Sequence, residues 1–186
     1  MTGQVSDEFR VEGNIYALVG VNGEGLYVPA DFGMETFSSC TACWRGYVMQ
    51  YDVKDDELLL VGMDLNTKNP VSINGVEPVE ATESFMKYRY VDIGLKTNFT
   101  GTILLGADFM SERYVHMGFQ SAESYRKVIE LVVENGDVLE IRDLSEEMEE
   151  RRKSGMEEKP REPSSLGDGV LSTWIKDRFS LDYDSE

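Results

Sequence analysis

The chain has 186 residues and carries 35 acidic against 18 basic side chains, for a formal net charge of −17. This length suffices for one domain with a substantial core plus an appendage. Binding to nucleic acid or to an anionic membrane depends on clustered Lys and Arg, so the charge argues against both partners. The negative charge is compatible with binding of a basic protein or a metal cation. It is equally compatible with a role in solubility alone.

The first ten residues contain neither a basic start nor an apolar run, so we expect no export signal. The longest apolar stretches, such as Leu58–Val61, are far too short to span a bilayer. Cys40 and Cys43 lie close together, and without an oxidising compartment a structural disulfide is not expected. The sequence therefore predicts a soluble, reduced, cytoplasmic protein.

A two-residue periodicity of apolar side chains, typical of half-buried strands, dominates the chain as far as Asp143. We expect residues 10–18 to form an opening strand and residues 23–25 to turn before the next one. A hairpin is expected with strands at residues 44–53 and 58–65, because strand-forming Val and Tyr flank a polar turn there.

Two Asn-Gly pairs give the clearest turn signals, since both residue types tolerate positive φ. The first pair is at residues 74–75. The second, at residues 135–136, lies between alternating runs in the stretch 129–142 and predicts a tight hairpin. One short helix is expected to interrupt the strands, near residues 81–88 or near residues 121–127.

These short, regularly spaced strands predict a mainly β domain, an antiparallel barrel or sandwich, over residues 1–143. Residues 144–186 are expected to form a short helical C-terminal extension. Its first part, residues 145–153, has acidic side chains in the first turn and basic side chains in the last, which suits the helix dipole. Glycine and proline then interrupt residues 155–169, a composition typical of a linker.

The last segment places apolar side chains at helical spacing, among them Trp174, Ile175 and Phe179. An apolar face of this kind is normally buried, and it most often packs against the protein's own domain. A second subunit or a protein partner is the alternative, which makes these three residues the candidates for partner binding.

Three short motifs occur in order along the chain: C-W-R-G-Y at residues 43–47, F-T-G at residues 99–101 and Y-V-H-M-G at residues 114–118. In this arrangement the chain resembles a family of small bacterial proteins that carry the same segments. The resemblance covers residues 37–142 and implies one compact domain. It implies no activity, cofactor or partner, because none is established for that family.

Arg45, Tyr47 and His116 are the candidate ligand-binding residues. A guanidinium inside a β domain needs an internal carboxylate, or else it faces a pocket where it binds an anion bidentately. His116 is the only histidine and is suited to act as a general base or ligand, although a lone histidine is more often bonded to a backbone carbonyl. No nucleophile accompanies it in a recognisable motif, so no catalytic residue is assigned.

No metal site is expected. Cys40 and Cys43 have the spacing of half a zinc site, but one histidine cannot complete a set of four ligands. They also have the spacing of a redox pair, yet an extended segment follows them where a helix is usual, so we interpret them as small buried residues. The acids within residues 52–57 lack the ligand ladder and central glycine of a calcium loop.

The sequence favours a non-enzymatic acidic binding protein of the immunity or inhibitor type, which docks a protein partner with a basic surface. The acidity of both parts of the chain and the absence of a catalytic motif support this hypothesis. The alternative is a small β-barrel enzyme or ligand-binding domain with a pocket near Arg45, Tyr47 and His116. A homo-oligomer formed through the C-terminal extension is also open, and no cofactor is expected.

Overall fold

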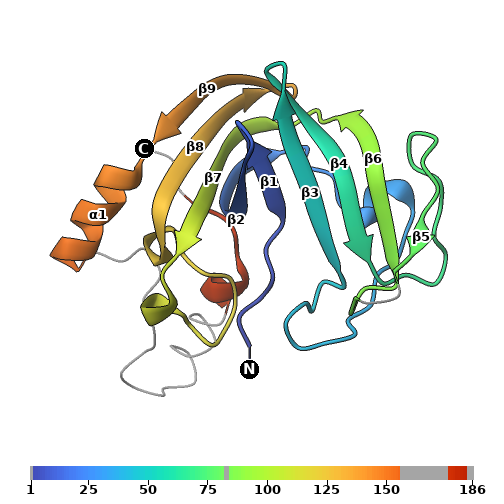
Figure 1. The fold of residues 1–186 in the computed structure, drawn as a ribbon, viewed down its shortest axis with the longest axis horizontal. Helices are drawn as coiled ribbons and strands as arrows, with labels where there is room; N and C mark the ends of the chain where they lie inside the picture. Colours follow the sequence, from blue (N-terminus) through green and yellow to red (C-terminus); the bar gives the residue numbers. More distant parts are fainter. Residues whose placement is uncertain (1, 82–83, 156–175, 184–186) are drawn as a thin grey trace.

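A computed structural model describes residues 2–81, 84–155 and 176–183 of the protein. Strands make up 48% of the structure, which confirms the mainly β architecture expected from the sequence. Seven of the strands form a closed barrel, and a short α-helix packs outside it (Figure 1). None of the helices in these ranges is long and apolar enough to cross a membrane.

The strands are β1 (Glu8–Val11), β2 (Asn14–Glu24), β3 (Tyr47–Lys54), β4 (Glu57–Leu65), β5 (Val79–Glu80), β6 (Tyr88–Lys96), β7 (Thr100–Phe109), β8 (Tyr125–Glu134) and β9 (Asp137–Asp143). The helical elements are the 3-10 turns η1 (Pro29–Phe32), η2 (Ser111–Arg113) and η3 (Ala122–Ser124) and the helix α1 (Ser145–Ser154). The strand order is β3-β1-β2-β7-β8-β9-β4-β6-β5, with β3 also paired to β4. The barrel therefore consists of β1–β4 and β7–β9, and β6 and β5 extend the sheet from β4.

One pair of adjacent strands in the barrel, β1 and β3, is parallel. β1 pairs with β3 in register with Phe9 opposite Tyr51, and the two rings stack with their centroids 4.7 Å apart. Both rings are buried in the main core. Parallel strands cannot be joined by a tight turn, so β2 and a long connection separate β1 from β3 in the sequence.

The strand pairing that closes the barrel, between β9 and β4, is short. β9 meets β4 at one residue pair, Glu57 with Asp137. The backbone N–H of Leu58 donates to the carbonyl oxygen of Gly136 at 2.8 Å beside it. The turn of the β8–β9 hairpin is thereby held against the turn of the β3–β4 hairpin, at the top of Figure 1.

The main core fills the barrel with alternate side chains of its strands. In β8, for example, Ile129, Leu131 and Val133 point inward, while Val128 joins a second cluster outside. This alternation is the two-residue period that the sequence displays. The other strands contribute to the main core chiefly Phe9, Leu18, Met49, Tyr51, Leu58, Leu60, Tyr90, Ile103 and Leu105.

Both Asn-Gly turns predicted from the sequence are confirmed. Asn135 and Gly136, with φ of 49° and 82°, form a two-residue connection between β8 and β9. Asn74 and Gly75 adopt φ of 50° and 81° in a second tight turn. Two consecutive residues with positive φ define the turn type that matches the twist of paired strands.

The single opening strand expected at residues 10–18 is wrong. The chain turns at Glu12 and Gly13, where φ is 50° and 78°, and forms the β1–β2 hairpin instead. Glycine adopts this left-handed backbone without cost, and glutamate follows it here at some steric cost.

The turn expected at residues 23–25 is also wrong. β2 continues to Glu24 and stays paired with β7, so that Gly23 lies opposite Gly101. A Cβ on either glycine would overlap the backbone of the facing strand, so the two glycines permit a close approach rather than a turn. The expected short helix is present as the three-residue turn η3, inside the second of its two proposed ranges.

The helix α1 lies on the outside of the barrel, as expected from its charged sequence. Met148 is buried against the outer faces of β2, β7 and β8. Two ion pairs between side chains four residues apart, Glu147–Arg151 at 3.0 Å and Glu149–Lys153 at 2.7 Å, lie on its exposed side. Each such pair stabilises a helix by only about 0.3–0.5 kcal/mol, so the packing of Met148 matters more.

Tyr125 belongs to the cluster under α1, and burial raises its pKa from 10.0 to about 12. The folded protein then holds the phenolic proton more tightly than the unfolded chain. For this group the free energy of unfolding is constant below about pH 10 and falls as pH rises from about 10 to about 12, by about 3 kcal/mol in total. We expect Tyr125→Phe to remove that part of the alkaline loss, measured by urea unfolding at about pH 9 and about pH 11.5. Parallel pH profiles for the two proteins would contradict it.

Gly13 and Gly136 are both second residues of two-residue hairpin turns, with φ of 78° and 82°. A Cβ on Gly13 would meet nothing within 4 Å, whereas a Cβ on Gly136 would overlap the carbonyl oxygen of Thr97. We expect Gly13→Ala to lower the free energy of unfolding by about 1 kcal/mol, through backbone strain alone. Gly136→Ala should cost about 2–4 kcal/mol. Equal losses in urea denaturation would show that the β8–β9 turn is not held against the β6–β7 connection.

Candidate functional site

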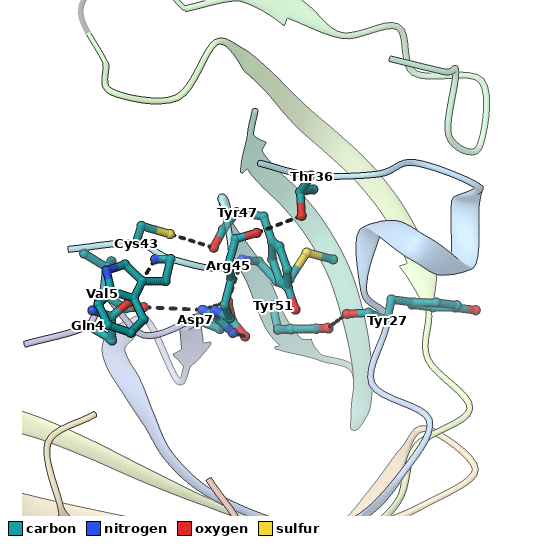
Figure 2. Close-up of polar contacts among 11 residues, drawn as sticks. Gln4, Val5, Asp7, Tyr27, Thr36, Cys43, Arg45, Tyr47 and Tyr51 are labelled. Carbon is teal, nitrogen blue, oxygen red and sulfur yellow. Dashed lines mark hydrogen bonds and ion pairs between the residues drawn. The ribbon is translucent and has the colours of Figure 1, made fainter. Parts of the chain in front are cut away.

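Arg45 is held inside the protein by an acid (Figure 2). Its Nη1 and Nη2 donate to Oδ2 and Oδ1 of Asp7 at 3.0 and 2.9 Å. Nη2 also donates to the carbonyl oxygen of Val5 at 3.3 Å. Oδ1 of Asp7 accepts the backbone N–H of Met49 at 2.8 Å. The internal carboxylate expected for Arg45 is therefore Asp7.

The backbone around Arg45 brings its side chain to that acid. Gly46 follows with φ of 74°, and a Cβ there would overlap the carbonyl oxygen of Phe37, so the close approach of the two segments requires glycine. From the same neighbouring segment, Thr36 Oγ1 donates to the carbonyl oxygen of Arg45 at 2.7 Å. The residue is thus fixed just before β3, facing the chain that leads into β1.

The guanidinium of Arg45 also lies over two rings, 4.7 Å from the centroid of Tyr47 and 5.3 Å from that of Phe119. Burial lowers the pKa of Arg45, but the charge and hydrogen bonds of Asp7 raise it by more. The pKa of Arg45 therefore lies above its ordinary value. Burial raises the pKa of Tyr47, an effect that Arg45 opposes. Arg45 is therefore a charged group whose donors are directed at internal partners.

The two cysteines beside this cluster are free thiols. Cys43 is buried, and its Sγ donates to the carbonyl oxygen of Tyr47 at 3.3 Å. Burial raises the pKa of Cys43 by more than nearby hydrogen bonds and Arg45 lower it, which makes the thiol a poor nucleophile. Within residues 2–81, 84–155 and 176–183, no three His, Cys, Asp or Glu side chains come together as metal ligands.

His116 lies on the surface. It is exposed, and its ring meets the ring of Tyr114 edge-on with 4.8 Å between centroids. Among the described residues, none of the contacts of His116 joins it to Arg45 or Tyr47. The structure thus brings Arg45 and Tyr47 together, and His116 contacts neither of them among the described residues.

A cleft of about 460 Å³ opens beside the loop that carries Phe37. Its lining consists of Gly33, Glu35, Thr36, Phe37, Thr67, Lys68 and Asn69. The buried hydroxyl of Thr67 serves the fold, since it donates to the carbonyl oxygen of Glu35 at 2.8 Å. None of the three candidate ligand-binding residues lines this cleft.

Carboxylates gather where the β3–β4 and β8–β9 hairpin turns meet. We call this surface the acidic tips, and it consists of Asp55, Asp56, Glu57, Glu134 and Asp137. Lys96 bridges the two turns, with its Nζ 2.9 Å from Glu57 Oε1 and 2.7 Å from Asp137 Oδ1. The other three acids are exposed.

Of the three candidates for partner binding, Phe179 lies within the described structure. Its ring stacks on that of Trp44, with centroids 4.9 Å apart, and packs against Met117. The protein's own domain therefore covers this side chain in part. Trp174 and Ile175 lie outside the described residues.

No protein-family model matches the chain. No curated protein and no solved structure matches it. The resemblance to a family of small bacterial proteins therefore stays a prediction.

Two features of this region are not predicted by the sequence. Asp7 is one of 35 acidic residues, and nothing local marks it as the partner of a residue 38 positions away. The extended residues 180–183 lie against β2, where Asp182 pairs with Val21. These four residues, S-L-D-Y, are too few to establish the period of a strand, so no local signal indicates the contact.

Arg45→Leu would leave the enclosed carboxylate of Asp7 without its partner, so we expect the free energy of unfolding to fall by about 3–5 kcal/mol. The matched control is Arg89→Leu, which removes an equally bidentate but exposed pair with Asp64, at 2.6 and 3.0 Å. That change should cost less than about 1 kcal/mol.

Urea denaturation measures both losses, and losses of similar size would contradict the structural role of Arg45. Adding Asp7→Asn to Arg45→Leu removes the unpaired charge, so the double variant should recover part of the stability. A double variant that is no more stable than Arg45→Leu would show that other contacts account for the loss.

Proposed function

We propose that the protein is a non-enzymatic acidic binding protein of the immunity or inhibitor type, which docks a basic surface of a protein partner. One observation carries this proposal: the acidic tips stand together at one end of the barrel (Figure 1). A basic surface that meets several carboxylates at once gains specificity and a faster encounter.

Backbone hydrogen bonds hold the acidic tips in a fixed arrangement. The N–H of Leu58 donates to the carbonyl oxygen of Gly136 at 2.8 Å, and the N–H of Val138 donates to that of Asp56 at 2.7 Å. Because the two turns are already ordered, a partner would not have to order their backbone on binding. Preorganisation of this kind favours affinity.

Nearby cations leave much of the charge of the acidic tips available. Lys96 is shared between one acid of each turn, while three acids are exposed and take part in no ion pair within the described residues. The formal net charge of −17 adds a long-range field of the same sign. Such a field attracts a basic partner and weakens as salt rises.

The alternative, an enzyme or ligand-binding domain with a pocket near Arg45, Tyr47 and His116, has less support. Arg45 directs its donors at Asp7 and at a backbone carbonyl, so an external anion would have to displace them. His116 is exposed and contacts neither Arg45 nor Tyr47 among the described residues. The cleft beside Phe37 is lined by other residues.

The test neutralises the exposed acids of the acidic tips with Asp55→Asn, Asp56→Asn and Glu134→Gln. Asparagine tolerates the positive φ of 52° and 60° at the first two positions. A partner is identified by affinity capture from the source cells, and its binding is then measured with the purified proteins at low and high salt. We expect the triple variant to bind at least about tenfold more weakly at low salt, with the difference reduced at high salt.

The matched control carries Asp92→Asn, Asp108→Asn and Glu150→Gln. It removes the same number of exposed carboxylates, two of them at positive φ, outside the acidic tips. It should bind like the unmodified protein. Equal weakening of both variants would indicate only a general charge effect, and unchanged binding by the first variant would refute the proposed surface.

A further inference from the structure

Residues 176–183 form a short helical turn followed by an extended stretch against the edge of β2. The N–H of Val21 donates to the carbonyl oxygen of Leu181 at 2.7 Å, and Val21 pairs in parallel with the next residue. In the helical turn, the carbonyl oxygen of Arg178 accepts the N–H of Phe119 at 2.7 Å. The main chain of the segment is therefore bound at two separate points.

β2 has a free edge here because its neighbour β1 is short. β1 pairs with β2 only as far as Ala17, and one further bond joins the N–H of Leu18 to the carbonyl oxygen of Asp7 at 2.9 Å. Beyond that point the edge of β2 would be unpaired, and an unpaired edge is a template for another strand. Residues 181–183 take this place, which is the mode of recognition called strand addition.

The apolar side chains of the segment pack at three different places along the groove. Phe179 packs outside the barrel, and Leu181 packs against the main core. The ring of Tyr183 lies on Gly20, where a Cβ would come within 2.6 Å of it, and its hydroxyl donates to Glu130 Oε1 at 2.9 Å. The intervening residues are polar. Main-chain bonds supply affinity in such a groove, and the pockets that receive these side chains supply specificity.

The start of the groove is fitted to the segment as well. Arg178 is only 1% exposed, which is rare for a charged residue. A Cβ on Gly118, where φ is 69°, would overlap the carbonyl oxygen of Arg178. The two backbones approach as closely as glycine allows, so the groove is specific for a chain that follows this path.

We propose that this groove also accepts residues 176–183 of a second copy, giving a dimer in which two copies exchange their C-terminal strands. The contacts that hold the segment do not depend on which copy supplies it. Residues 156–175 connect the segment to α1 and would span up to about 70 Å when fully extended, enough to reach a neighbouring barrel. The acidic tips take no part in this exchange.

The intact chain is expected to be a monomer at micromolar concentration. A tethered segment meets its own groove at an effective concentration in the millimolar range, which favours docking within one copy. Two copies with a net charge of −17 each also repel one another, and salt screens that repulsion. Shortening the tether removes the route within one copy and leaves exchange as the way to fill the groove.

The experiment compares the full chain with two deletions, of residues 161–170 and of residues 156–175. The end of α1 and residues 176–179 lie well apart in Figure 1, so joining Gly155 directly to Lys176 prevents docking within one copy. Molar masses come from light scattering after size exclusion, at about 0.15 M and about 0.5 M salt. We expect a monomeric full chain and a share of dimer that grows with the length of the deletion and with salt.

Phe179→Asp with Leu181→Asp, added to each deletion, should abolish the dimer, because both side chains fill the groove. A dimer that persists with these changes would overturn the proposal, since its contacts would lie elsewhere. Folded monomers in both deletion variants would overturn it too.

A second measurement uses the full chain and tests the proposal even if the deletion variants fail to fold. Two differently tagged full chains are unfolded in urea and refolded together at high concentration, and native mass spectrometry detects mixed dimers. Mixing a wild-type copy with one that carries Leu181→Asp should reduce the mixed dimers, because the variant accepts a strand but cannot donate one. The absence of mixed dimers between wild-type copies would overturn the proposal.

Discussion

The ion pair between Arg45 and Asp7 is the interaction on which the N-terminal half of the barrel depends. Through Asp7 it joins β2, which donates the N–H of Leu18 to its carbonyl oxygen, and β3, which donates the N–H of Met49 to its carboxylate. The parallel joint between β1 and β3 has no turn to set its register, so this polar contact at its entrance sets it. Because a buried ion pair contributes little net stability, its main effect is to select one arrangement of these strands.

Local features of the fold could be predicted from the sequence, and partners distant in the sequence could not. Asn135 and Gly136 adopt left-handed backbone whichever strands they join, so their turn was predictable from two residues. The turn at Glu12 was missed because glutamate seldom takes positive φ and only the following glycine signals it. The parallel β1–β3 joint and the β9–β4 closure join strands whose own patterns say nothing of their neighbours.

In the candidate site, too, some features could be predicted from the sequence and others could not. The need of Arg45 for an internal acid follows from the cost of burying a charge, but the identity of Asp7 follows only from the path of the chain. His116 is a polar residue in an apolar sequence context, and exposure cannot be read from such a context. The apolar character of the C-terminal segment was predicted, whereas its extended stretch was not, because residues 180–183 are too short to establish a period.

The C-terminal strand also bears on how the chain is made. Leu181 packs against the main core, yet it is synthesised after nearly every other described residue. The rest of the barrel must therefore assemble around a gap at the edge of β2 while synthesis continues. In a nascent or prematurely terminated chain, the main chain at Val21 would stay open to strands of neighbouring molecules. The order of synthesis thus leaves this edge open to aggregation in an unfinished molecule.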